Sequence, residues 1–112
     1  MNTTATLKTL LEPASIAVVG ASDDTTKPGG KLVRNILLRG FAGELLLVNP
    51  KSESVQGVRA FASVDALPVA PDLAFIAIPA KLVRQALMDL AHKGAKAVVV
   101  LSAGFGEVGA EG

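Results

Sequence analysis

The feature that most constrains the fold is the run at residues 15–20, SIAVVG, which is apolar almost throughout. It shows no alternation of apolar and polar residues, which is typical of a strand buried on both faces of a parallel sheet. A polar loop follows from Ala21 and leads through Lys27 and Pro28 to an amphipathic stretch. We therefore expect a strand, a turn and a helix whose N-terminus faces that turn. Such an arrangement suits phosphate, because the first N–H groups of a helix have no partner within it.

Three later runs have the same character as the first. They cover residues 44–48, 72–78 and 97–101, and each is rich in Leu, Ile, Val or Ala. Pro50 follows the first of the three and Pro79 ends the second, and proline is not tolerated inside a central strand. The four runs together predict a sheet of at least four buried strands.

Two stretches between these runs have the spacing of amphipathic helices. The first carries apolar residues at 32, 33, 36 and 37, and Gly40 is suited to the position just after the helix end. The second runs from Leu82 to Ala91 with the same periodicity and is ended by Gly94. Strands and helices therefore alternate along the chain.

Weaker patterns occur in four other places. Residues 6–12 have leucines at helical spacing before Pro13, which predicts a short helix that docks on the core. Residues 57–60 are compatible with a short edge strand, and residues 63–67 with a single helical turn. The glycine-rich end, 102–112, has too few apolar residues for a further element.

Strands that alternate with helices over short loops specify a parallel sheet with right-handed crossovers and helices on both faces. We therefore predict an α/β fold of the Rossmann-like, doubly wound type, in three layers. With 112 residues the chain is expected to form one domain, 1–112, with a single core. Ligands of such sheets lie beyond the carboxyl ends of the strands, where the strand order reverses. Here these ends are residues 20–22, 48–51, 78–79 and 102–104.

The charge balance argues against two classes of partner. Eleven basic residues face ten acidic ones, and no run of Lys or Arg occurs, so neither nucleic acid nor an acidic membrane surface is expected to bind. The chain has no cysteine, which excludes thiol catalysis and zinc–thiolate sites, and no metal site is expected. Residues 1–6 do not have the pattern of a signal peptide, so we expect a cytoplasmic protein.

The loop after the first strand differs from the fingerprint of dinucleotide-binding domains. That fingerprint is G-x-G-x-x-G, with an acidic residue near the end of the second strand for the ribose hydroxyls. Here the glycines stand at 20, 29 and 30, and the second strand ends in Asn49, Pro50 and Lys51. An ammonium group in place of the acid favours phosphate. The sequence therefore indicates a ligand that carries phosphate at its ribose end.

No set of residues predicts catalysis by this chain. Asp23 and Asp24 are adjacent in a polar loop, where such residues are commonly solvated or involved in turns. Ser22 and Ser102 have no histidine that the sequence places near them. His92 is the only histidine, and we expect it on the polar flank of the second helix. We therefore assign no catalytic residue.

Five motifs resemble, in order and spacing, the CoA-binding domain of NDP-forming acyl-CoA synthetases. They are SIAVVGAS at 15–22, KPGG at 27–30, VNPK at 48–51, AIP at 77–79 and SAGF at 102–105. That family includes the ADP-forming acetate–CoA ligases and is related to the succinyl-CoA synthetase alpha subunit. The resemblance covers the chain from about residue 7 to its end. A ligand of this family agrees with the separate inference, drawn from Lys51 without any family resemblance, that the ligand carries phosphate at its ribose end.

The resemblance implies a site for coenzyme A. Residues 20–22 would lie against the nucleotide phosphates, Lys51 would meet a phosphate of CoA, and Ile78 and Pro79 would flank the nucleotide or the pantetheine. Residues 102–104 would line the path of the thiol arm. The candidate cofactor-binding residues are Gly20, Ala21, Ser22, Lys27, Gly29, Gly30, Asn49, Pro50, Lys51, Ile78, Pro79, Ser102, Ala103 and Gly104.

Members of that family continue beyond the SAGF segment into a further helix and strand and into a second domain with a phosphorylated histidine. The resemblance therefore implies an N-terminal fragment that lacks the last elements of the fold, and that meets ATP or ADP only through other domains or subunits. His92 is not assigned the phosphohistidine role. Two alternatives remain open: a CoA-sensing regulatory domain of a protein lysine acetyltransferase, and an NAD(P)-binding Rossmann domain.

Overall fold

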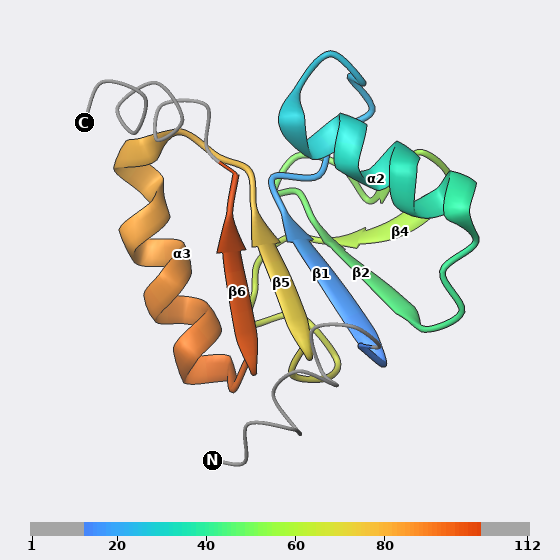
Figure 1. The fold of residues 1–112 in the computed structure, drawn as a ribbon. Helices are drawn as coiled ribbons and strands as arrows, with labels where there is room; N and C mark the ends of the chain where they lie inside the picture. The colour runs from blue at the N-terminus through green and yellow to red at the C-terminus, as the bar shows by residue number, and fades with distance from the viewer. Residues whose placement is uncertain (1–12, 102–112) are drawn as a thin grey trace.

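The computed structural model describes residues 13–101, which form one six-stranded sheet with a helix on each face (Figure 1). The strand order is β3-β4-β2-β1-β5-β6. The elements, in chain order, are β1 (Ser15–Val19), α2 (Pro28–Arg39), β2 (Glu44–Val48), β3 (Ser54–Val55), β4 (Val58–Phe61), β5 (Leu73–Ile76), α3 (Ala80–Lys93) and β6 (Ala97–Val100). The prediction of a Rossmann-like α/β fold is confirmed.

Strand β1 lies at the centre of the sheet, between β2 and β5, and is parallel to both. Every one of its residues is buried, as the absence of alternation in the sequence predicts. The chain adds β2 and β4 on one side of β1, then β5 and β6 on the other. The strand order therefore reverses next to β1, which is where sheets of this type bind ligands.

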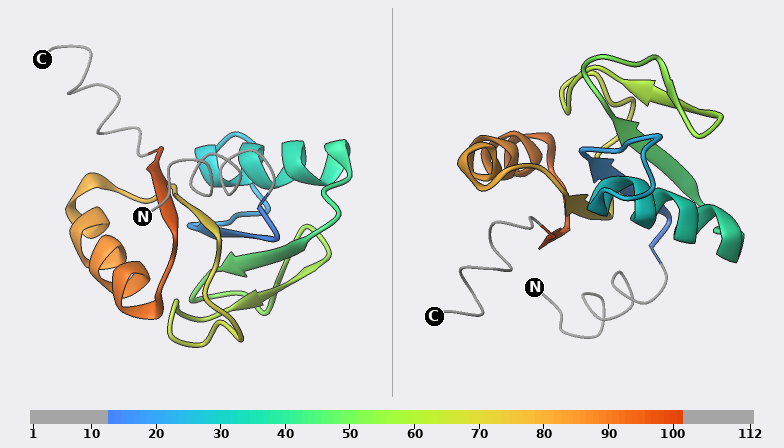
Figure 2. Two further views of the ribbon diagram at one scale, coloured as in Figure 1. Left: turned by 60° about the horizontal axis from the view of Figure 1, so that its bottom comes forward. Right: turned by 90° about the horizontal axis from the view of Figure 1, so that it is seen from above.

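The two helices cover opposite faces of the sheet (Figure 2). On one face, Val33 and Ile36 of α2 pack with Val18 of β1. On the other, Val83 and Leu90 of α3 pack with residues of β1, β2 and β5. Alternate residues of the central strand thus serve two separate cores, and the predicted three-layer arrangement is present.

Both predicted helix ends are confirmed. Gly40 follows α2 with φ 68° and its N–H donates to the Leu37 carbonyl, while Gly94 follows α3 with φ 100° and donates to the Leu90 and Ala91 carbonyls. Both glycines therefore have the left-handed conformation that closes a helix. In the last turn of α3, His92 is exposed, as expected.

The structure differs from the sequence-based expectations at the β4 side of the sheet. Residues 58–61 form a strand, but β4 is not the edge, because the two-residue strand β3 pairs with it in antiparallel orientation. The two residues of β3 are too few to show the alternation of apolar and polar residues by which a strand is predicted from sequence. Residues 63–67 contain two overlapping turn hydrogen bonds, which place Val64 and Leu67 in the core, but no helix. The predicted helix at 6–12 and the predicted irregular end at 102–112 lie outside the described residues.

A polar cluster joins three strands at the amino end of the sheet. The Asp72 carboxylate accepts the Ala14 N–H at 2.8 Å and lies 3.3 Å from the Lys96 ammonium. The hydroxyl of Ser15, which is buried, accepts the Asp72 N–H at 2.9 Å. The Ala14 hydrogen bond, helped by Lys96, keeps the pKa of Asp72 below its ordinary value. This end of the molecule is therefore structural, while the carboxyl ends of the strands are free to build a site.

Candidate functional site

The carboxyl ends of β1, β2 and β5 surround a cleft of about 710 Å³. The volume is in the range of small-molecule sites, roughly 300–1,000 Å³. The cleft is lined by Gly20, Ala21, Ser22, Lys27, Pro28, Asn49, Pro50, Lys51, Ala77, Ile78, Pro79 and Ala80. It therefore lies at the reversal of strand order that the alternating sequence pattern predicts.

Gly20 is the first residue after β1 and lines the cleft. Its φ is 95°, and a Cβ at this position would overlap the Ala77 carbonyl and approach the Ile78 Cγ2 to 2.8 Å. Its N–H donates to the Val48 carbonyl at 3.2 Å, and the Ala77 N–H donates to the Val19 carbonyl at 2.8 Å. Only glycine satisfies both the conformation and the close approach. The bare backbone at this turn leaves room for a ligand against the ends of the strands.

Asn49 connects the end of β2 to the loop after β1. Its Nδ2 donates to the Ala21 carbonyl at 3.0 Å, while its Oδ1 accepts the N–H groups of Lys51 at 2.8 Å and Ser52 at 3.1 Å. The amide is thus used by the protein itself and shapes one wall of the cleft. It does not offer the free carboxylate that ribose hydroxyls would need.

The N-terminus of α2 borders the cleft, with Lys27 before the helix and Pro28 in its first turn. The next two residues are buried glycines. A Cβ on Gly29 would overlap the Gly20 carbonyl, and one on Gly30 would overlap the Asp24 carbonyl. These two glycines let the helix approach the turn after β1 closely, and neither lines the cleft. In the described structure they allow the first turn of α2 to pack directly against the backbone of the preceding loop.

The electrostatic character of the cleft suits an anion. Pro79 and Ala80, at the N-terminus of α3, also line it, so two helix N-termini point toward one space. Neither helix has an acidic residue in its first turn or a side chain that caps it. The partial positive charge of both ends therefore stays uncompensated. Lys27 and Lys51 add two ammonium groups, and no Asp or Glu is among the described residues of the lining.

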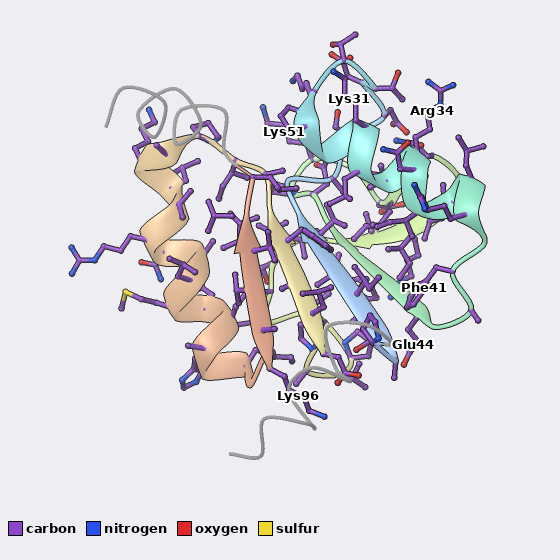
Figure 3. The ribbon with its side chains drawn as sticks, in the orientation of Figure 1. Lys31, Arg34, Phe41, Glu44, Lys51 and Lys96 are labelled. Atoms are coloured by element: carbon purple, nitrogen blue, oxygen red, sulfur yellow. The ribbon has the colours of Figure 1, made fainter. Side chains whose placement is uncertain are left out.

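Figure 3 places Lys51 at the end of the sheet where α2 begins, and Lys96 at the opposite end. Lys31 and Arg34 project from α2 without lining the cleft (Figure 3). His92 lies in the last turn of α3, whereas it is the first turn of that helix that borders the cleft. The single histidine is therefore remote from the site.

The loop between β1 and α2 carries two carboxylates, and both are engaged outside the cleft lining. Asp24 Oδ1 accepts the N–H of Thr26 at 2.9 Å and its hydroxyl at 2.6 Å, and Asp23 Oδ1 accepts the Gln56 N–H at 2.6 Å. The Thr26 hydroxyl, the Thr26 N–H and the charge of Lys27 lower the pKa of Asp24. These contacts make the acids part of the loop structure, as the sequence indicates.

The structure brings together most of the residues that the sequence nominates. Nine of them line the cleft: Gly20, Ala21, Ser22, Lys27, Asn49, Pro50, Lys51, Ile78 and Pro79. Gly29 and Gly30 pack behind the lining, and residues 102–104 lie outside the described part of the chain. Pro28, Ala77 and Ala80 also line the cleft but were not nominated. Pro28 and Ala77 belong to the KPGG and AIP motifs and Ala80 directly follows the second, but their small apolar side chains carry no chemical pattern of their own.

Among residues 13–101, no group of three or more His, Cys, Asp or Glu side chains is arranged to hold a metal ion. Within the same residues, no helix has the length and apolar character that crossing a bilayer requires.

A doubly wound sheet with an anion-suited cleft at its reversal point defines a Rossmann-like nucleotide-binding domain. More specifically, the family described as CoA binding domain matches residues 14–110, and the chain belongs to that family. The resemblance found from the five sequence motifs is thereby confirmed, and so is the expectation of coenzyme A as the ligand of the domain.

Curated relatives and solved structures agree with this family. The chain is 46% identical over 100 residues to the acetate–CoA ligase [ADP-forming] II subunit alpha of Pyrococcus furiosus, covering 89% of this chain and 22% of that protein. It is 39% identical to acetate–CoA ligase [ADP-forming] II of Archaeoglobus fulgidus, covering 95% and 16%. The dinucleotide-forming acetyl-coenzyme A synthetase 1 of Candidatus Korarchaeum cryptofilum, solved with phosphate and ADP, superposes with a TM-score of 0.85 at 38% identity, covering 94% and 23%. The chain thus spans about a fifth of the length of these relatives.

Proposed function

We propose that the cleft binds coenzyme A as the cofactor-holding domain of an ADP-forming acyl-CoA synthetase. The family match supports the ligand, and the ligases and synthetases among the relatives support the class of enzyme. The acetyltransferase and NAD(P) hypotheses have no comparable support. The observation that carries the proposal is Lys51 in the cleft wall, at the position after β2 where a dinucleotide-binding domain has an acid.

The described residues fit the anionic half of coenzyme A. This ligand carries a pyrophosphate and a 3′-phosphate on its ribose, and the cleft offers two helix N-termini and two lysines, with no Asp or Glu among the described residues that line it. The missing side chain at Gly20 leaves room for the pyrophosphate beside the N-terminus of α2, the kind of end that binds phosphate. Lys51 would meet the 3′-phosphate, and Ile78 and Pro79 would pack against the nucleotide or the pantetheine.

Bound coenzyme A supplies a thiol that can accept an acyl group. The residues of this chain bind and orient that cofactor, and we assign none of them a role in bond making. In the larger enzyme that we propose, other domains would use ATP, form the acyl phosphate and carry the phosphohistidine. The remote position of His92 agrees with a site that holds the cofactor while other domains perform the chemistry.

Calorimetric titration of the 112-residue chain with coenzyme A and with dephospho-CoA, which lacks the 3′-phosphate, tests this function. We expect the wild type to prefer coenzyme A by roughly tenfold, the effect of one partly exposed charge-assisted contact. Lys51→Gln should remove that preference and leave dephospho-CoA binding nearly unchanged. Arg34→Gln, which removes an exposed positive charge from α2 away from the lining, is the matched control.

Equal affinity of the wild type for the two ligands would refute the role of Lys51. Absence of binding to either ligand would refute the cleft as a coenzyme A site in this chain. Displacement of coenzyme A by NADH at similar concentration would instead favour a general dinucleotide site.

A further inference from the structure

The turn between β3 and β4 is bound to the loop that precedes α2, although it does not line the cleft. The side-chain Nε2 of Gln56 donates to the Ser22 carbonyl at 2.9 Å and to the Gly30 carbonyl at 2.9 Å. The backbone N–H of Gln56 donates to the Asp23 carboxylate at 2.6 Å. One residue thus contacts the first residues of the loop and the first turn of the helix at once.

Gln56 holds this position in an uncommon backbone conformation. Its φ is 50°, and it is the only residue other than glycine with a positive φ among residues 13–101. Such a conformation costs a non-glycine residue free energy, which the surrounding structure has to offset. Gly57, the next residue, has φ 82°, and Val55, the preceding one, is fully buried under α2. The side chain is held against the loop by its hydrogen bonds to the Ser22 and Gly30 carbonyls.

The three hydrogen bonds orient groups that matter for an anion. A planar trans peptide has its C=O and N–H in opposite directions, so anchoring the Ser22 carbonyl on Gln56 turns the Asp23 N–H away from the hairpin. The Asp23 carboxylate is held on the hairpin instead of approaching the phosphate site. The contact with the Gly30 carbonyl fixes the first turn of α2 relative to the loop.

Resting on the proposed function, we propose that Gln56 is a positioning residue for phosphate recognition. It preorganises the loop of residues 22–30 and the N-terminus of α2 without touching the ligand. The Ser22 and Gly30 carbonyls accept from its side-chain amide, so loss of that amide frees both at little cost to the hydrophobic core, whereas the Asp23 carboxylate keeps its bond to the backbone N–H of residue 56. Affinity for any ligand that places phosphate on this loop then falls, because binding has to order the loop first.

The test uses two variants with different backbone effects. Gln56→Leu removes the amide at similar size, and Gln56→Gly removes it while favouring the positive φ of the turn. We expect both to lose roughly tenfold in affinity for coenzyme A by calorimetry, and to lose the same factor for dephospho-CoA, because the two share the pyrophosphate. The matched control is Gln85→Leu, which removes the same amide from α3, where the Gln85 amide donates to the Asp89 carboxylate across one turn.

A second readout follows the loop itself. Hydrogen exchange of backbone amides, measured by NMR without ligand, should be faster for residues 22–30 in both variants, with β1 and β5 unchanged. A general loss of structure would instead accelerate exchange in the strands and lower the urea midpoint of Gln56→Gly.

The outcomes separate this inference from the function on which it rests. If the wild type binds coenzyme A and both variants bind it equally well, the positioning role is refuted and the proposed function stands. A loss limited to coenzyme A, with dephospho-CoA unaffected, would place Gln56 at the ribose phosphate and also overturn the inference. If the wild type does not bind coenzyme A, the proposed function fails, and unchanged exchange of residues 22–30 in the variants would then refute loop positioning by itself.

Discussion

The substitution Gly29→Ala has two opposite effects on the stability of the folded domain. Alanine favours a helix over glycine by up to about 1 kcal/mol, and φ at this position is not in the positive region. The new methyl group, however, would overlap the carbonyl oxygen of Gly20, a backbone atom at the end of the central strand. That strand end is held by the hydrogen bond from Gly20 to Val48, so α2 has to move instead. Overpacking of this kind costs about 1–3 kcal/mol.

We therefore expect Gly29→Ala to destabilise the domain by about 1–2 kcal/mol, since overpacking exceeds the gain in helix propensity. The chain has no Trp or Tyr, so urea unfolding is followed by far-ultraviolet circular dichroism, where the midpoint should fall by about 0.3–2 M. Because the displaced element is the N-terminus of α2, affinity for coenzyme A should fall by roughly tenfold as well.

Gly40→Ala is the matched control for Gly29→Ala. Gly40 has φ 68° but no atom within 4 Å of an added Cβ. Strain in the left-handed conformation should cost about 1 kcal/mol, with no effect on coenzyme A binding. A Gly29→Ala variant as stable as the wild type, or one that binds coenzyme A unchanged, would show that contact with Gly20 does not fix the helix end.

Three further predictions concern the polar clusters and the core. Asp72→Asn should lower the free energy of unfolding at pH 7 by about 1 kcal/mol. Because folding lowers the pKa of Asp72, this difference in unfolding free energy between variant and wild type should shrink as the pH falls below 3.8. Urea unfolding at several pH values measures it. Asn49→Asp keeps an acceptor for the Lys51 N–H but places a negative charge in the cleft, so calorimetry should show a larger loss of coenzyme A affinity than for Asn49→Leu. Leu90→Ala, on the buried face of α3, should lower the free energy of urea unfolding by about 2–5 kcal/mol. The folded variant should keep the affinity of the wild type for coenzyme A, and weaker binding would contradict the separation of core and cleft.

The sequence predicts the central architecture well because burial leaves a clear pattern. A run such as SIAVVG without alternation requires cover on both faces, and the structure buries all of β1. The glycines after the two amphipathic stretches predict the helix ends correctly, since few other residues adopt the left-handed conformation. The candidate site follows from the same logic, because parallel strands bring their carboxyl ends to one edge.

The two-residue strand β3 and the turn at Gln56 are invisible in the sequence. Nothing in the letters SESVQGV specifies a strand, and a polar residue before glycine in a turn has no evident link to a loop more than thirty residues earlier. The contacts of Gln56 with Ser22 and Asp23 exist only because β4 pairs with β2 and brings the hairpin beside α2. Similarly, the sequence nominates Gly29 and Gly30 as cofactor-binding residues, and only the structure shows that a side chain at either position would overlap a backbone carbonyl of the preceding loop.

The sequence by itself therefore determined the fold class and the end of the sheet at which the candidate cleft lies, and Lys51 in the sequence predicts a ligand with phosphate. These properties depend on local periodicity and on the chemistry of single residues at strand ends. The tertiary structure alone decided how the loop before α2 is held, which amides are already used, as in Asn49, and which carboxylates are kept from the cleft. Such properties depend on distances between segments remote in the chain, and these distances are set only when the strands pair.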